Sequence, residues 1–211
     1  MKFDYHDIYK KYDMTGELHI GTGIVMVHDI FDPIPEFMKT ADALFCDPPC
    51  SKQNLSSFYT KAEKEKRTDD FADFRERLFR VIEEINPKYV FLEVFKSNAQ
   101  SFYEYLDHNY KNMKIFNSMY YRNPRNECFI LMASNEELPQ IDLEGLDEEV
   151  CIEKICNEVD FNCIADPCMG KGLVGFYANK AGKKFVGTEL NMKRLAVCVE
   201  RVTTGKRGNI N

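Results

Sequence analysis

Two short apolar segments, far apart in the chain, each end in Asp-Pro, and this pair constrains the fold more than any other feature. The first is residues 43–46, Ala-Leu-Phe-Cys, which Asp-Pro-Pro follows at residues 47–49. The second is residues 163–165, Cys-Ile-Ala, which Asp-Pro follows at residues 166–167. Short apolar runs that stop at proline are typical of buried strands, because proline lacks the backbone N–H that a sheet ladder needs. We therefore expect two buried strands, each with a carboxylate directly after it.

The rest of the chain alternates between short apolar runs and amphipathic stretches. The apolar runs predict strands at residues 23–28, 43–46, 89–95, 115–121, 128–133, 163–165 and 185–187. The amphipathic stretches predict helices at residues 36–40, 69–85, 102–106, 150–159, 173–181 and 191–202. Strands that alternate with helices favour an α/β fold with a doubly wound, mostly parallel sheet covered on both faces. The turn at residues 123–126 predicts one antiparallel hairpin within that sheet.

Two segments lack an apolar period. Residues 51–67 are polar, with cations that include Lys61, Lys64, Lys66 and Arg67, so they predict a mobile loop. Residues 135–149 are acidic and predict a linker. The 211 residues fit one domain, 1–211, with no room for a separate target-recognition domain.

Composition excludes some classes of protein and favours others. The eight cysteines lie mostly inside apolar runs, and no signal peptide or membrane span opens the chain, so we expect reduced thiols and a cytoplasmic protein without a membrane partner. Cys151 and Cys156 lack the paired spacing of a zinc site, so no metal is expected. The formal charge of -6 restricts any nucleic-acid-binding face to a local patch.

The second Asp-Pro segment is typical of a nucleoside-cofactor site. Gly170 and Gly172 follow it, and glycines between a strand and a helix let the backbone approach a ligand closely. The next predicted strand ends near Glu189, whose carboxylate can accept hydrogen bonds from two ribose hydroxyls. A plain turn and a solvated glutamate would give the same pattern, so the two features count only together.

The residues of the Asp-Pro-Pro segment are suited to holding an amine. Asp47 stands on a turn that Pro48 and Pro49 stiffen, so a carboxylate oxygen and a proline carbonyl can face one point in space. Two such acceptors would orient the lone pair of an aromatic amine toward an electrophilic methyl group. A proline-capped loop without chemistry is the alternative for this motif taken alone.

Taken together, the motifs resemble the S-adenosylmethionine-dependent amino methyltransferases of DNA, in the permuted, beta-class order. Asp-Pro-Pro resembles their catalytic motif, and residues 164–172 are similar to their cofactor motif, Asp-Pro-Phe-x-Gly-x-Gly. Residues 187–191 resemble the segment whose acid binds the ribose, and residues 28–29 resemble a Gly-Asp pair near the cofactor. The resemblance covers residues 24–202 with gaps. It implies a Rossmann-like methyltransferase fold, S-adenosyl-L-methionine as cofactor, and transfer to a base flipped out of DNA, with adenine favoured.

The resemblance also implies a role for each matching residue. The catalytic residues would be Asp47, Pro48, Pro49 and Cys50. The cofactor-binding residues would be Asp29, Asp47, Asp166, Cys168, Gly170, Gly172, Glu189 and Leu190. DNA would be the partner, as in DNA methylation by restriction-modification systems.

The chain departs from the family at one catalytic position. The family has an aromatic residue after Asp-Pro-Pro, which stacks on the flipped base, whereas this chain has Cys50. Phe58 and Tyr59 are the nearest rings in sequence that could replace it. Cys50 also permits another chemistry, because cytosine carbon-five methyltransferases use a cysteine nucleophile there and a glutamate that Glu93 resembles.

Several alternatives stay open at this stage. The same site could methylate the amino group of cytosine, an RNA or a protein, or the chain could be a catalytically inactive partner subunit of the same fold. Because no reader domain fits, recognition would be loose or would come from a homodimer or a separate recognition subunit. Of the flexible segments, only residues 51–67 carry the cations to contact phosphates.

Overall fold

The structure is a computed structural model that describes residues 8–120, 123 and 125–208. Its strands are β1 (Glu17–Ile20), β2 (Gly23–Val27), β3 (Ala43–Cys46), β4 (Tyr89–Phe95), β5 (Asn112–Met119), β6 (Glu127–Ser134), β7 (Leu146–Asp147), β8 (Cys163–Asp166) and β9 (Lys184–Glu189). Its α-helices are α1 (Lys52–Lys61), α2 (Phe71–Ile85), α3 (Ala99–Asn109), α4 (Glu148–Glu158), α5 (Leu173–Lys180) and α6 (Met192–Thr204). Short 3-10 helices occupy Ile8–Lys11 and Glu36–Thr40. No helix among these residues has the length and apolar character that crossing a bilayer requires.

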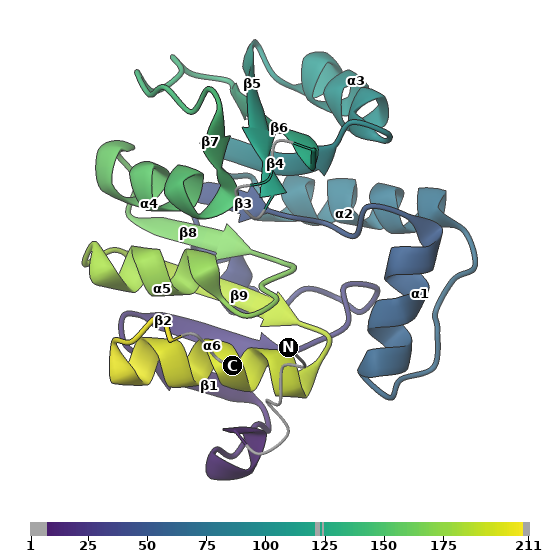
Figure 1. The fold of residues 1–211 in the computed structure, drawn as a ribbon, viewed down its shortest axis with the longest axis vertical. Coiled ribbons are helices and arrows are strands. Elements are labelled where there is room, and N and C mark those ends of the chain that lie inside the picture. The colour runs from purple at the N-terminus through teal and green to yellow at the C-terminus, as the bar shows by residue number, and fades with distance from the viewer. Residues whose placement is uncertain (1–7, 121–122, 124, 209–211) are drawn as a thin grey trace.

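One sheet connects all these strands, in the order β1-β2-β9-β8-β3-β4-β6-β5-β7 (Figure 1). The five central strands β2, β9, β8, β3 and β4 are parallel to one another. From β3 the chain passes through α1 and α2 to β4, which is the next strand in one direction along the sheet. From β8 it passes through α5 to β9, which is the next strand in the opposite direction. The strand order therefore reverses between β3 and β8, which is where ligands bind in open α/β sheets.

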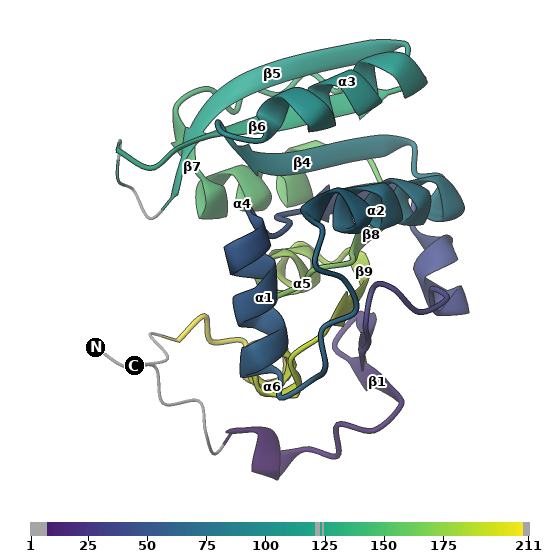
Figure 2. The ribbon, with the colours of Figure 1, turned by 90° about the vertical axis from the view of Figure 1, so that its right-hand side faces the viewer.

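The sheet is covered on both faces, as the alternation of strands and helices predicts. Phe45 and Phe91 point to the face that α4, α5 and α6 cover, and Leu44 and Leu92 point to the face of α2 and α3. Figures 1 and 2 show these two layers. Side chains of successive strand residues alternate between faces, so continuous apolar runs such as β3 are buried on both.

The predicted antiparallel hairpin is confirmed. β5 pairs with β6 along its whole length, with Ser118 opposite Cys128, and β6 also pairs antiparallel with β4. The predicted strand at residues 115–121 begins earlier, at Asn112, and its last residue lies outside the described chain. So does residue 124 of the predicted turn. A second hairpin, β1 with β2, escaped prediction because β1 is short and only half buried.

The prediction of a mobile loop at residues 51–67 is wrong, because α1 occupies most of it. Ser51 caps the helix: its hydroxyl oxygen accepts the Asn54 N–H at 3.1 Å. Leu55 and Tyr59 lie one turn apart and are buried. Few apolar residues mark this helix in the sequence, and tertiary contacts of those few stabilise it.

The acidic linker is shorter than the predicted residues 135–149. The chain is irregular as far as Gly145, then forms β7 beside β5, and α4 begins at Glu148. The Asp147 side chain accepts the Glu149 N–H at 3.2 Å and so caps α4. This places Glu148 at the first turn of a helix rather than in a linker.

Candidate active site

The central parallel strands each carry a carboxylate at or near their carboxyl ends. In sheet order these residues are Asp29 after β2, Glu189 in β9, Asp166 in β8, Asp47 after β3 and Glu93 in β4. The parallel strands all end at the same edge of the sheet, so residues that are distant in sequence become neighbours. Asp47 and Asp166, which end the two Asp-Pro strands, lie on either side of the point where the strand order reverses.

A cavity of about 910 Å³ lies at this edge. It is lined by the predicted residues Asp29, Asp47, Pro48, Pro49, Cys50, Asp166, Cys168, Gly170, Glu189 and Leu190. Its volume is in the range of small-molecule and cofactor sites. The structure therefore brings both halves of the predicted site together, with Gly172 as the exception.

The two glycines of the predicted cofactor loop have different roles. Gly172 does not line the cavity, although it was expected to bind cofactor: it caps α5 with a φ of 73°, and a Cβ there would lie 2.2 Å from the Cys198 sulfur. It is a packing glycine, which lets α5 approach α6. Gly170, with a φ of 54°, does line the cavity, and a Cβ there would lie 2.6 Å from Nη2 of Arg194.

Backbone N–H groups fix the carboxylates on the cofactor-motif side. Glu189 accepts the Gly170 N–H at 2.7 Å and the Asn191 N–H at 2.9 Å, one on each oxygen. Asp166 accepts the Cys168 N–H at 3.0 Å. Burial raises the pKa of Glu189 and raises the pKa of Asp166 well above its usual range. Each carboxylate oxygen keeps a second lone pair, so both residues can still accept hydrogen bonds from a ligand.

Asp47 is held by a side chain from a distant segment, the residue directly after β5. The Tyr120 hydroxyl donates a hydrogen bond to Oδ1 of Asp47, and the Tyr120 ring stacks on Phe95 with centroids 4.6 Å apart. Burial raises the pKa of Asp47 to about 6, against the opposing effects of the Tyr120 hydrogen bond and the Arg194 charge. At pH 7 this carboxylate is mostly ionised and able to accept hydrogen bonds.

Cys50 lines the cavity, whereas Glu93 lies behind its wall. The Cys50 N–H donates to Oδ1 of Asn54 at 3.2 Å, and its carbonyl accepts Nδ2 of Asn98 at 3.2 Å. Glu93 is fully buried in β4 and accepts the Cys128 thiol at 3.3 Å. Cys50 and Glu93, which would be the nucleophile and the acid of a carbon-five methyltransferase, therefore do not both line the cavity.

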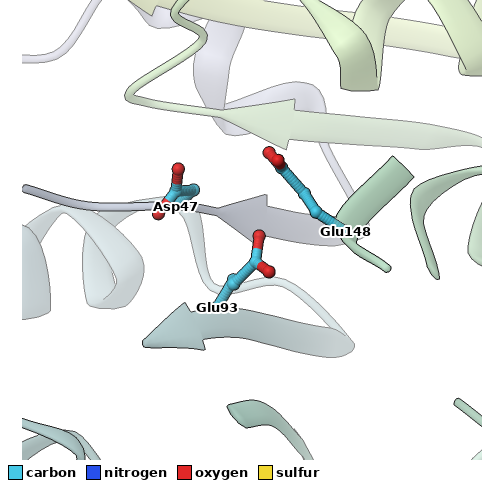
Figure 3. A group of neighbouring side chains, drawn as sticks. All are labelled: Asp47, Glu93 and Glu148. Atoms are coloured by element: carbon cyan, nitrogen blue, oxygen red, sulfur yellow. The ribbon is translucent and has the colours of Figure 1, made fainter. Parts of the chain in front are cut away.

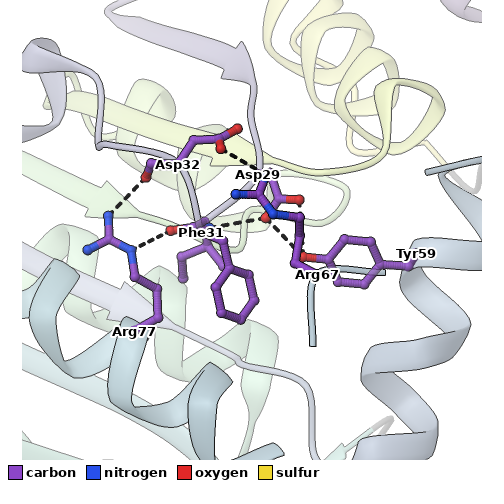
Figure 4. A network of polar contacts seen from close by, with 7 residues as sticks. Asp29, Phe31, Asp32, Tyr59, Arg67 and Arg77 are labelled. Carbon is purple, nitrogen blue, oxygen red and sulfur yellow. Dashed lines mark hydrogen bonds and ion pairs between the residues drawn. The ribbon is translucent and has the colours of Figure 1, made fainter. Parts of the chain in front are cut away.

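The two rings expected to replace the family aromatic residue are otherwise engaged. The Tyr59 hydroxyl lies 2.9 Å and 3.1 Å from the two carboxylate oxygens of Asp29, to which it donates (Figure 4). Phe58 lines the cavity, and the Arg194 guanidinium lies 4.9 Å from its ring centroid. Asp29 therefore binds α1 to the loop after β2, in addition to lining the cavity.

Two arginines extend this connection around the loop after β2. Arg67 donates to Oδ1 of Asp32 at 2.9 Å, and Arg77 donates to the carbonyls of Ile30 at 2.7 Å and Asp32 at 2.9 Å (Figure 4). These bonds join the loop to α2 and to the segment between α1 and α2. The side of the cavity that α1 covers is thus fixed by contacts between segments far apart in sequence.

Three carboxyl groups cluster beside the cavity in a way that no motif indicated. Asp47, Glu93 and Glu148 come from β3, β4 and α4, and an oxygen of each lies within 4.8 Å of the others (Figure 3). Burial, with the charge of Asp47 as the second cause, raises the pKa of Glu148 to about 8. Burial also raises the pKa of Glu93 well above its usual range. Glu148 lines the cavity.

Sequence reasoning missed several residues of the lining, among them Phe95, Tyr120, Glu148 and Arg194. Arg194 had a weak signal, since it lies in the first turn of the helix after Glu189. The others had none, because the pairing of β4 with β6 and the position of α4 bring them to the cavity.

Comparisons with solved structures identify the fold. M1.HpyAVI matches with a TM-score of 0.57 at 19% identity over 84% of this chain and 96% of that chain, and it has also been solved with S-adenosylmethionine. TTHA0409 from Thermus thermophilus, named as a DNA modification methylase and complexed with S-adenosyl-L-methionine, matches with a TM-score of 0.52 at 15% identity over 79% of this chain and 96% of that chain. PvuII DNA methyltransferase (cytosine-N4-specific) matches with a TM-score of 0.53 at 10% identity over 88% of this chain and 94% of that chain.

No family model and no curated protein sequence matches the chain. The similarity is thus one of three-dimensional structure, carried by the sheet and its covering helices. These comparisons and the sheet order lead to one conclusion: the chain has the α/β fold of the S-adenosylmethionine-dependent DNA methyltransferases.

Proposed function

We propose that this protein is an S-adenosylmethionine-dependent methyltransferase that modifies the exocyclic amino group of a nucleobase in DNA, with adenine favoured. The observation that carries the proposal is the position of Asp47. It stands on a buried Asp-Pro-Pro turn and lines the same cavity as Asp166 and Glu189. Their order along the chain, with Asp47 first, is that of the permuted amino methyltransferases.

The cavity fits the proposed cofactor. Glu189 keeps one lone pair on each oxygen after its two backbone bonds, as a pair of ribose hydroxyls requires. Gly170 leaves space where a side chain would collide with Arg194. Leu190 and Asp166 also line the cavity, where Leu190 would lie against the adenine ring and Asp166 near the methionine part. When bound, the cofactor supplies an electrophilic methyl group on sulfur.

The chain's own contribution is to hold the target amine. Asp47 would accept one amine hydrogen and the Pro48 carbonyl the other, so that the nitrogen lone pair points away from both. Tyr120 keeps the Asp47 carboxylate in one orientation. After transfer, the extra proton on the nitrogen would pass to Asp47, whose carboxylate is ionised above about pH 6.

Phe95 supplies the ring that Cys50 lacks. It is half-buried, lines the cavity and stacks on Tyr120, which in turn bonds to Asp47. An aromatic face next to the catalytic carboxylate can stack on a flipped base, and such stacking contributes about 1 to 3 kcal/mol. Although Cys50 stands where the family has an aromatic residue, Phe95 would give the target side of the cavity an aromatic wall.

DNA is favoured as substrate by the structural neighbours, since two of the three named above are DNA methylases by name. Target recognition would come from a second copy or a separate subunit. Two cations of the segment expected to contact phosphates are engaged within the chain, because Arg67 pairs with Asp32 and Lys66 pairs with Asp69. Ion pairs of this kind reduce the charge available to a phosphate backbone.

Incubation with S-adenosylmethionine and unmethylated genomic DNA, followed by nucleoside digestion and mass spectrometry, tests the proposal. N6-methyladenine is the expected product. N4-methylcytosine would support the same catalytic site with cytosine as the target base. 5-methylcytosine would instead identify Cys50 as the catalytic nucleophile. Parallel reactions with RNA and protein separate the other substrates.

A second candidate, an inactive subunit of the same fold, is favoured by Cys50 and by the lack of room for a reader domain. Titration calorimetry with the cofactor distinguishes it from the first. The enzyme should bind S-adenosylmethionine, whereas a subunit without a ligand should not. Cofactor binding without any methylated product, even with added cell extract, would favour the inactive subunit.

A further inference from the structure

Each Asp-Pro segment carries a cysteine close to its aspartate. Cys46 directly precedes Asp47 and is the last residue of β3. Cys168 comes two residues after Asp166, which ends β8. The amino methyltransferases that the chain resembles have phenylalanine in the place of Cys168. Both halves of the cavity therefore hold a thiol next to the carboxylate on which the proposed function depends.

The sheet brings these two cysteines together. β3 and β8 are parallel neighbours, with Leu44 opposite Ala165. Two residues further along, the same register places Cys46 opposite Pro167 and next to Cys168. Neighbouring strands lie about 4.7 to 4.9 Å apart. A disulfide needs Cα atoms about 4.4 to 6.8 Å apart, so the spacing of the two strands is suited to one.

The two side chains lie on the same face of the sheet. Cys46 belongs to the apolar cluster on the side of α2 and α3, and Cys168 packs against that cluster. Burial, and next the neighbouring Cys168 thiol, raise the pKa of Cys46 well above its usual range. Both residues are free thiols in the structure. The sulfur atoms are therefore neighbours, as the strand register predicts.

The two thiols differ in their exposure to the cavity. Cys168 is half-buried and lines the cavity, whereas Cys46 is 0% exposed and does not line it. A small oxidant that enters the cavity therefore meets Cys168 first. An accessible cysteine beside a second one that can attack it is the arrangement of redox-sensing pairs. Such transient disulfides also occur in compartments that keep most thiols reduced.

We propose that Cys46 and Cys168 are a reversible redox pair, which a peroxide converts into a disulfide that weakens cofactor binding. In the first step, a peroxide oxygen bonds to the Cys168 sulfur as the O–O bond breaks, which gives a sulfenic acid and water. In the second step, the Cys46 sulfur attacks the Cys168 sulfur. The S–S bond forms, the S–O bond breaks, and the oxygen leaves as water with the Cys46 proton. The two sulfurs together lose two electrons, and the peroxide gains them.

The disulfide would act on the cofactor loop. The Cys168 N–H donates to Asp166 at 3.0 Å, and the N–H of Gly170 donates to Glu189 at 2.7 Å. A covalent bond from Cys168 to the end of β3 would draw this loop away from that geometry. This consequence rests on the proposed function, because it concerns the cofactor, whereas formation of the disulfide does not. Coupling of two equilibria is reciprocal, so bound S-adenosylmethionine should in turn disfavour the disulfide.

Peroxide treatment followed by alkylation, trypsin digestion and mass spectrometry tests the pairing. The expected product is peptide 40–52 joined to peptide 155–171 by one disulfide. Fragment spectra should place the bond at Cys46 and Cys168, although the two peptides contain three further cysteines. Dithiothreitol should separate the peptides again.

Titration calorimetry measures the effect of oxidation on the cofactor site. S-adenosylmethionine should bind the oxidised protein roughly tenfold more weakly than the reduced protein, within the usual range of coupling between two sites. Dithiothreitol should restore the affinity. Cofactor added before the peroxide should lower the yield of the disulfide.

Three variants assign the chemistry to the two residues. Cys168→Ser should form no disulfide, and its affinity for S-adenosylmethionine should be the same before and after peroxide. Cys46→Ala should stop at the sulfenic acid of Cys168, which dimedone labels. Cys50→Ser is the matched control, because Cys50 is also half-buried and lines the cavity. The control should form the disulfide as wild type does.

Other results would contradict separate parts of the proposal. Oxidation of wild-type Cys168 to the sulfinic acid alone, or its pairing with Cys50, would overturn the pairing. A disulfide that leaves the affinity for S-adenosylmethionine unchanged would overturn the effect on the cofactor. If neither the reduced nor the oxidised protein binds the cofactor, the proposed function fails, and the joined peptides would still establish the redox pair. The peptide result uses the wild-type protein, so it holds even if a substitution unfolds the chain.

Discussion

The two sides of the cavity are built in different ways. On the cofactor side, Asp166, Gly170 and Glu189 come from consecutive elements, and backbone N–H groups hold the carboxylates. On the target side, Asp47 and Tyr120 come from segments far apart in sequence, and one bond between side chains joins them. Sequence motifs can therefore describe the first side, whereas the second depends on the packing of the sheet.

This difference gives a physical reason for the departure at Cys50 from the amino methyltransferases that the chain resembles. A backbone N–H donor is present whatever the side chains are, but its position depends on the conformation of the loop. The cofactor side therefore tolerates little change in its loop geometry. A stacking ring can be supplied by any element that reaches the same space. Cys50 and Phe95 are consistent with such an exchange of roles on the target side.

The largest expected effect comes from Asp47→Asn. The amide keeps the shape and an acceptor for Tyr120, but it loses the charge that draws on the amine hydrogens. Turnover of methyl transfer should fall about 10²- to 10³-fold, the usual loss for one preorganised polar group. Single-turnover kinetics measure the rate of methyl transfer, and a cofactor titration measures the affinity for S-adenosylmethionine separately. If cofactor affinity fell by the same factor, Asp47 would belong to the cofactor side.

Phe95→Ala tests whether the missing ring has been replaced. Loss of a stacking face worth about 1 to 3 kcal/mol should lower kcat/KM roughly ten- to hundredfold. Cys50→Tyr in the same background should restore part of that loss by placing a ring at the family position. Phe58→Ala is the matched control, because that ring contacts Arg194. An equal loss in the control would remove the distinction between the two rings.

Gly172→Ala tests the packing of α5 against α6, behind the cofactor loop, through stability. Its φ of 73° disfavours any side chain, and the added Cβ would overlap the Cys198 sulfur. We expect unfolding in urea to show a loss of about 1 to 3 kcal/mol, as overpacking of a core does. Gly182→Ala, which also has a positive φ but meets no atom within 4 Å, isolates the backbone effect. Equal losses in both variants would argue that α5 and α6 are not packed this closely.

The smallest effect is expected from Tyr120→Phe. The hydroxyl lowers the pKa of Asp47 by bonding to its charged form, so its removal should raise that pKa further above about 6. Methyl transfer requires the ionised carboxylate, and its rate falls as pH drops through this pKa. The acidic limb of the pH–rate profile should move to higher pH, with rates near wild type at pH 9. A uniform loss at every pH would mean that the hydroxyl only supports the fold.

The predicted elements succeeded where local patterns were strong. The bounds of β3 and β4 agree with the apolar runs from which they were predicted. Both strands are buried on both faces, so nearly every residue is apolar, and the segments are easily recognised. α1 was missed for the opposite reason: much of its stability comes from Leu55 and Tyr59, and Tyr59 is bound by Asp29.

The sequence by itself determined the central strands, the position of the two aspartates after the Asp-Pro strands, and the cofactor-motif side. These follow from hydrophobic burial and from the conformational limits of proline and glycine, which act over a few residues. Only the tertiary structure decided that Tyr120 meets Asp47 and that Glu148 joins Glu93. Those meetings depend on strand order and on where α4 begins. Burial then shifts the pKa values of these carboxyl groups, because removal from water acts on groups that the fold, and not the chain order, has placed together.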